Sequence, residues 1–134
     1  MSGLVVLAEL TLPGTLCSVR HARLFLRDTL VPGHLAAGDE ALDDMTLVVD
    51  ELAANGVRHT GSGRGGKISI ALLAGPEVLR AEVSDDGADG ARPVLRKAST
   101  GETGRGLHIV DALASCWGYR PDGVRTTVWA DFRR

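Results

Sequence analysis

Cysteine is scarce in this sequence. Cys17 and Cys116 are the only two, and they lie far apart along the chain. Two such residues exclude the framework of several disulfide bridges that holds many small secreted domains together. Because both fall in segments whose apolar pattern is helical, we expect them to be buried free thiols.

The sequence also lacks a long apolar run and a concentration of positive charge. No stretch approaches the roughly 20 apolar residues of a membrane-spanning helix, and the N-terminus lacks the basic start and cleavage pattern of a signal peptide. The 15 basic and 17 acidic residues give a net charge of -2, and the basic residues are scattered. We therefore expect a cytoplasmic protein that binds neither membrane nor nucleic acid directly.

Internal repeats, metal-ligand spacing and nucleophile signatures are missing as well. The four histidines are dispersed, which argues against a zinc site, and there is no Gly-x-Ser-x-Gly motif. The 134 residues are 44% hydrophobic and 24% charged, so we expect one globular domain over residues 1–134. Lysine supplies only two of the basic residues, Lys67 and Lys97, a composition that indicates a GC-rich bacterial genome.

Strand and helix patterns follow one another along the chain. Strands are predicted over 4–12, 68–72, 79–85 and 124–132, and helices over 16–30, 40–60 and from Leu107 through Trp117. Thr15 and Asp39 are expected to cap the first two helices. The two middle strands are expected to form a hairpin. This order predicts an α+β fold, a two-layer α/β sandwich whose mainly antiparallel sheet carries its helices on one face.

Two glycine-rich segments could bind phosphate. The segment 61–67 matches the dinucleotide-binding pattern G-x-G-x-x-G and nearly matches the P-loop motif, but Ile68 stands where the P-loop motif needs Ser or Thr. It also leaves a helix and enters a strand, the reverse of what either motif requires, so we interpret it as a connecting loop. The segment 101–106 precedes a predicted helix, where free N–H groups favour an anion. Taken alone, that segment fits a phosphate site and a tight loop equally well.

Four polar residues are expected near the boundary between helices and sheet. Glu51 and Asn55 are four residues apart and project from one side of a helix, beside its apolar face. By strand periodicity Asp85 should point toward the helices and be partly buried, and Thr126 should share that face. A buried carboxylate needs a donor, which an adenine amino group could supply. The alternatives are an inert Glu–Asn surface pair and an aspartate that caps a turn at Gly87.

Four motifs occur in the order typical of the GHKL ATPase superfamily: Glu51–Asn55, Asp85–Gly87, Gly104–Leu107 and Thr126–Val128. Nearly the whole chain takes part in this resemblance, which implies a Bergerat fold. In size and in the segments 51–59 and 104–118, the chain resembles the stand-alone anti-sigma-factor serine kinases. It departs from the family pattern where Asp89 replaces a glycine and where Arg125 precedes Thr126.

The resemblance implies ATP and Mg²⁺ as ligands. Asn55 would coordinate the Mg²⁺, and Glu51 would be the catalytic base that activates the attacking hydroxyl. Asp85 would hold the adenine amino group, with help from Gly87 and Thr126. The phosphates would be wrapped by the residues of the third motif, Gly104, Arg105, Gly106 and Leu107, with Arg105 offsetting charge.

The implied function is that of a serine kinase that sequesters a sigma factor and phosphorylates an antagonist protein of the STAS type. A homodimer is also implied. A catalytically inactive module, which binds nucleotide only to set the shape of a partner-binding surface, is the main alternative. The catalytic domain of a sensor histidine kinase is a third possibility, although no preceding helical pair carries a phosphoacceptor histidine. A fourth is an interaction domain that binds no nucleotide.

Overall fold

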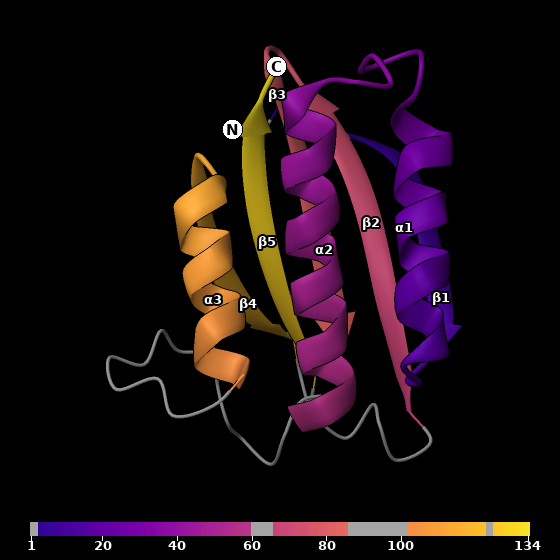
Figure 1. Ribbon diagram of the computed structural model, residues 1–134, viewed down its shortest axis with the longest axis vertical. Helices are drawn as coiled ribbons and strands as arrows, with labels where there is room; N and C mark the ends of the chain where they lie inside the picture. The colour runs from indigo at the N-terminus through magenta and orange to yellow at the C-terminus, as the bar shows by residue number, and fades with distance from the viewer. Residues whose placement is uncertain (1–2, 60–65, 86–101, 123–124) are drawn as a thin grey trace.

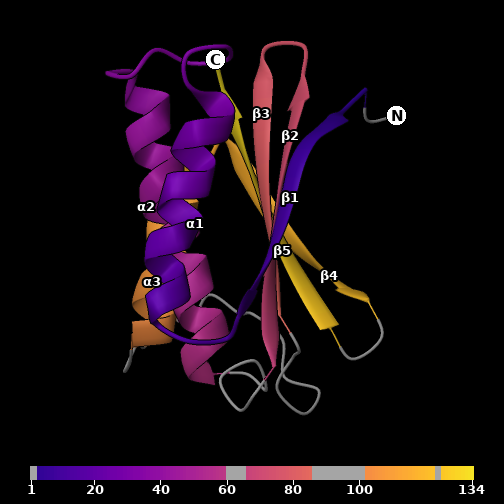
Figure 2. The ribbon, with the colours of Figure 1, turned by 90° about the vertical axis from the view of Figure 1, so that its right-hand side faces the viewer.

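The molecule has a layer of helices and a layer of strands. The computed structural model describes residues 3–59, 66–85, 102–122 and 125–134. Within these residues the elements are β1 (Val5–Pro13), α1 (Cys17–Leu30), α2 (Glu40–His59), β2 (Lys67–Gly75), β3 (Val78–Asp85), α3 (Glu102–Leu113), β4 (Cys116–Asp122) and β5 (Arg125–Arg133). Figure 2 shows the helices together on one face of the sheet. The expected α+β sandwich is confirmed.

The sheet is antiparallel throughout the described residues. Its strand order is β1-β2-β3-β5-β4, so β1 and β4 form the two edges. The predicted hairpin is present: β2 and β3 pair from Ser69↔Ser84 to Gly75↔Val78. Glu77 lies in the turn with φ of 59°. Figure 1 shows that β3 and α2 run in the same direction and end at the same end of the molecule.

The start of α2 follows from its sequence. Asp39 caps the helix as expected, because its Oδ1 accepts a hydrogen bond of 2.8 Å from the backbone N–H of Ala41. Glu40 and Asp43 lie in the first turn, where negative charge favours the positive end of the helix dipole.

The start of α1 differs from the expectation. Leu16 is the N-cap residue and already has a helical conformation, with no side-chain capping bond. The hydroxyl of Thr15 lies 3.4 Å from that of Ser18, and Ser18 in turn donates to the carbonyl of Pro13 at 2.6 Å. Thr15 therefore does not cap the helix with its side chain, because the Ser18 hydroxyl is its neighbour instead of a backbone N–H.

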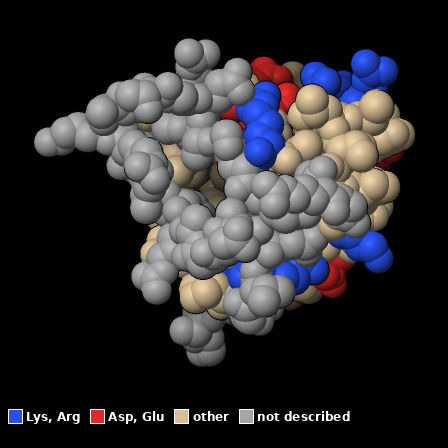
Figure 3. Space-filling view, turned by 90° about the horizontal axis from the view of Figure 1, so that it is seen from below, with Lys and Arg blue, Asp and Glu red and all other residues tan. Residues whose placement is uncertain are grey.

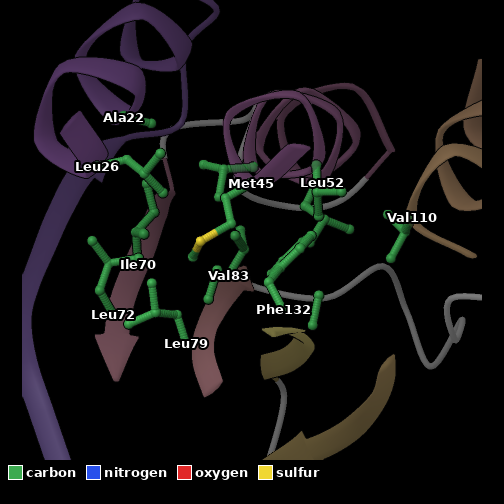
Figure 4. Packing of buried hydrophobic residues seen from close by; sticks show 14 of the residues in the cluster. Ala22, Leu26, Met45, Leu52, Ile70, Leu72, Leu79, Val83, Val110 and Phe132 are labelled. Atoms are coloured by element: carbon green, nitrogen blue, oxygen red, sulfur yellow. The ribbon is translucent and has the colours of Figure 1, made fainter. Parts of the chain in front are cut away.

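The core lies between the two layers. Figure 4 shows side chains from all three helices, including Leu26, Met45 and Val110, pointing toward those of the strands. Met45 is fully buried, and so are Leu72 and Leu79 on the facing strands. Burying a side chain of this size stabilises the fold by about 1.5–3 kcal/mol, so this layer fixes how α2 sits on β3. No helix among the described residues is long and apolar enough to cross a membrane.

Strand β4 corrects a sequence-based expectation. The third helix was expected to continue through Trp117, but α3 ends at Leu113 and Cys116–Asp122 pairs with β5. Trp117 still packs against the core and donates its indole N–H to Asp111 at 2.9 Å. Because Trp117 contacts the core, its position in the sequence continues the apolar pattern of the preceding helix although it lies in a strand. Cys17 and Cys116 are both exposed, so the expectation of buried thiols was wrong.

Candidate functional site

Four elements converge at one end of the molecule. The C-terminal part of α2, the last residue of β3, the beginning of β5 and the beginning of α3 all lie at the lower end in Figure 1. Helix α2 packs against both α3 and β3. Figure 3 looks onto this end and shows basic side chains among the described residues that surround it. The motifs found in the sequence are thus brought to a common end by the topology.

Helix α2 supplies the carboxylate and the amide. Glu51 and Asn55 are both partly buried, and they lie one helical turn apart on the same side. The Asn55 Oδ1 atom is buried and has no hydrogen-bond partner among the described residues. Leaving such an oxygen unsatisfied costs about 1–3 kcal/mol. Its chemistry fits a hard cation such as Mg²⁺, which prefers oxygen ligands.

Asp85 and Thr126 face each other across two strands. They are direct partners in the antiparallel pairing of β3 with β5. Both are partly buried, and they share the face of the buried pair Val83 and Val128, which is the helix face. The orientation expected from strand periodicity is confirmed. A carboxylate acceptor and a hydroxyl therefore lie side by side beneath α2.

Gly56 brings α2 close to Asp85. A Cβ atom added to Gly56 would lie 3.3 Å from the Cβ of Asp85 and 3.4 Å from its Oδ2. Because Asn55 directly precedes Gly56, its amide and the Asp85 carboxylate belong to the same end of the site. Sequence reasoning missed Gly56, although a glycine inside a helical pattern is the signal that could have found it.

The third motif lies inside α3. The helix begins at Glu102, so Gly104, Arg105 and Gly106 belong to its first turns and do not precede it as expected. The free N–H groups of a first turn still favour an anion. Leu107 is only 2% exposed and belongs to the core. It is the sixth residue of α3, so its backbone N–H lies beyond the free groups of the first turn and is less suited to an anion than those before it.

Other expected features lie outside the described residues. These are Gly87 of the second motif, most of the segment from Ala88 to Thr103 that includes Asp89, and most of the glycine-rich segment 61–67. The sequence-based statements about them stay predictions.

Arg125 does not enter the helix face. It precedes Thr126 on β5, so its side chain takes the opposite face of the sheet. There its Nη2 donates to the Ser69 hydroxyl at 3.3 Å and to the Ser84 carbonyl at 3.4 Å. The departure from the family pattern at this position therefore leaves the space around Asp85 free of the arginine side chain.

An ion pair joins α1 to α2 next to Glu51. Arg23 Nε lies 3.3 Å from Asp50 Oδ1, and the Arg23 side chain is 49% exposed. Burial raises the pKa of Asp50; Arg23 opposes this shift, and the neighbouring Glu51 adds to it. Asp50 thus faces α1 while the next residue faces the site.

A cavity of about 410 Å³ opens at the opposite end of the sheet. Its lining comes from the β2–β3 turn and from the ends of β4 and β5, including Cys116 and Asp131. None of the residues named by the four motifs lines it, so it is separate from the site described above.

Comparison with known proteins agrees with this arrangement. Residues 12–132 match the family model described as the histidine kinase-like ATPase domain. The chain belongs to this family. No curated protein matches the sequence. The resemblance to GHKL ATPases seen in the sequence is thereby confirmed, and the ligand class of a histidine kinase-like ATPase domain is ATP.

A solved structure is similar to this histidine kinase-like ATPase domain. It contains the RsbU and RsbW domains of Rv1364c from Mycobacterium tuberculosis and shares 26% sequence identity, with a TM-score of 0.70. The similarity covers 94% of this chain but only 31% of that chain. This chain therefore spans about a third of the length of that chain.

Proposed function

We propose that this histidine kinase-like ATPase domain is an ATP-dependent protein serine kinase that acts as an anti-sigma factor. Its protein substrate would be a STAS-type antagonist, its binding target a sigma factor, and its functional form a homodimer. The family, the structural similarity to a chain with an RsbW domain and the sequence resemblance to anti-sigma-factor kinases support this proposal.

One observation carries the nucleotide part of the proposal. The Asn55 amide oxygen is buried without a hydrogen-bond partner among the described residues, one residue before the point where α2 contacts Asp85. A Mg²⁺ ion bound to ATP would satisfy this oxygen and neutralise phosphate charge. Asp85 and Thr126 would then receive the adenine, with the help from Gly87 that the family resemblance implies. In this proposal both the adenine and the Mg²⁺-bound phosphates of ATP lie near the C-terminal part of α2.

The chemistry proposed for transfer needs one base. The Glu51 carboxylate accepts the proton of the substrate serine hydroxyl as that oxygen bonds to the γ-phosphorus. The bond from the γ-phosphorus to the bridging oxygen breaks at the same time, and ADP leaves. The first turns of α3, with Gly104, Arg105 and Gly106, would hold the phosphates, and Leu107 would anchor them to the core. Positioning and charge stabilisation supply most of such a rate enhancement.

The test is transfer of labelled phosphate from ATP to a STAS-type antagonist protein, with Glu51→Ala as the variant. Glu51 is proposed to accept the serine proton and not to hold the nucleotide. Its loss should therefore spare ATP binding and abolish transfer. As a matched control, Glu40→Ala removes a carboxylate from the exposed far end of the same helix, and it should leave transfer unchanged.

The outcomes separate the proposed kinase from its alternative. Phosphoserine formed by the wild type but not by Glu51→Ala supports the proposal. ATP binding without transfer to any antagonist would show a nucleotide-dependent binding module instead. Equal transfer rates in the wild type and Glu51→Ala would refute the role of Glu51 as the base.

A further inference from the structure

Gly56 occupies a position in α2 where glycine is unfavourable by itself. The helix extends from Glu40 to His59, so Gly56 lies well inside its last turns. Glycine lowers the stability of a helix interior because it loses the most backbone freedom on folding. It is also buried, so the missing side chain is not explained by exposure to solvent. A glycine here needs a packing reason.

The packing reason is the side chain of Asp85. An ideal Cβ on Gly56 would lie 3.3 Å from Asp85 Cβ, 3.4 Å from Oδ2 and 3.8 Å from Cγ. All three neighbours belong to the one carboxylate-bearing side chain. The 3.3 Å separation from Asp85 Cβ is tighter than ordinary contact, whereas those from Oδ2 and Cγ are ordinary contacts. A methyl group at residue 56 would therefore displace the carboxylate by a few tenths of an ångström or push α2 away from β3.

Asp85 has little freedom to accept such a displacement sideways. It is the last residue of β3, and its backbone is paired with Thr126 of β5. The preceding Ser84 is held on the other face of the sheet, where its hydroxyl lies 2.7 Å from that of Thr127. The sheet thus holds the backbone of Asp85 in place. On the helix side, Gly56 leaves room for the Asp85 side chain.

We propose that Gly56 is a positioning residue for the nucleotide site: by lacking a side chain, it sets the place of the Asp85 carboxylate against α2. The inference rests on the proposed function, in which Asp85 receives the adenine amino group. Asn55, the proposed magnesium ligand, directly precedes Gly56 in the chain, so this close approach lies next to the magnesium end of the proposed site. Gly56 has no side chain to contact a ligand, and in this proposal it acts through Asp85.

The test compares Gly56→Ala with Gly38→Ala in the full chain. Gly38 has open space where its Cβ would be placed, so the second variant makes the same chemical change without touching Asp85. ATP and ADP affinities are measured by calorimetry in the presence of Mg²⁺, and Tm is measured for each protein. We expect Gly56→Ala to weaken ATP and ADP binding to a similar extent, by threefold or more, while its Tm stays at or above that of the wild type.

Each other outcome overturns the inference. Unchanged affinity in Gly56→Ala would show that the contact does not position the carboxylate, and a loss shared by Gly38→Ala would show a general effect of alanine. A loss that comes with a lower Tm would show a structural role only. A loss for ATP but not for ADP would place the effect at the phosphate end. If the folded wild type binds neither nucleotide, the proposed function itself fails, and this is recognised before any variant is compared.

Discussion

Replacing Asp85 by asparagine should weaken ATP binding while leaving the fold intact. Asparagine has nearly the same size, so the close contact with Gly56 and the strand pairing with Thr126 are kept. The carboxylate, however, is exchanged for an amide that presents its own donor to the adenine amino group. The perturbation is therefore confined to one charged hydrogen-bond acceptor.

The size of the effect follows from the position of Asp85. It is partly buried under α2, where a hydrogen bond to a charged group is only partly screened by water. The loss of such a bond costs about 1–3 kcal/mol, which corresponds to roughly a 5- to 150-fold rise in Kd. The predicted change is large enough for calorimetry to measure.

The assay is a calorimetric titration with ATP and Mg²⁺, accompanied by thermal unfolding. Asp43→Asn is the matched control, because it makes the same chemical change at an exposed position in the first turn of α2. Its Kd should equal that of the wild type. The reasoning about Asp85 would be refuted by an unchanged Kd in Asp85→Asn, or by equal losses in the two variants.

Three further variants test other parts of the structure. Asn55→Ala should remove most of the dependence of ATP binding on Mg²⁺, because it deletes the buried oxygen that has no partner in the described part of the chain. Calorimetry with and without Mg²⁺ measures this, and an undiminished dependence would exclude Asn55 as the ligand. Burial raises the folded-state pKa of Asp50 above 3.8, so its ionised form costs stability at neutral pH, and this cost disappears as the pH falls toward the unfolded-state value. In urea unfolding at pH 7, Asp50→Asn should therefore be as stable as the wild type or more stable, by up to about 1 kcal/mol given the exposure of Arg23. This difference in unfolding free energy should shrink as the pH is lowered toward 4.5. A difference that grows on acidification would contradict this. Gly118→Ala should destabilise the protein by about 1–3 kcal/mol, since its Cβ would lie 2.8 Å from Trp129 Cζ2; an unchanged urea midpoint would show that the ring moves away freely.

Side-chain periodicity predicted most of the fold and the orientation of two site residues. In the predicted apolar stripe of α2, Met45 and Val48 are fully buried and Val57 is partly buried, as a 3.6-residue period requires. The two-residue period placed Asp85 and Thr126 on the helix face, and the register makes them partners. Asp39 was identifiable as a cap because its local chemistry does not depend on distant contacts.

Features that depend on contacts distant in sequence could not be predicted in this way. Strand β4 contains Gly118 and Pro121, which weaken the strand signal, but an edge strand tolerates proline. Gly118 is explained only by the indole of Trp129, which occupies the space of its missing side chain. Gly56 is explained only by Asp85, which follows it by 29 residues. A local sequence pattern does not show which distant side chain occupies the space beside a glycine.

The central claim is that the end formed by α2, β3, α3 and β5 binds ATP with Mg²⁺. It is tested most directly by calorimetric titration of the wild-type protein with ATP, with and without Mg²⁺, after thermal unfolding has shown that the sample is folded. We expect saturable binding of one ATP per chain that weakens strongly when Mg²⁺ is removed. A folded protein that takes up no ATP under either condition would contradict it.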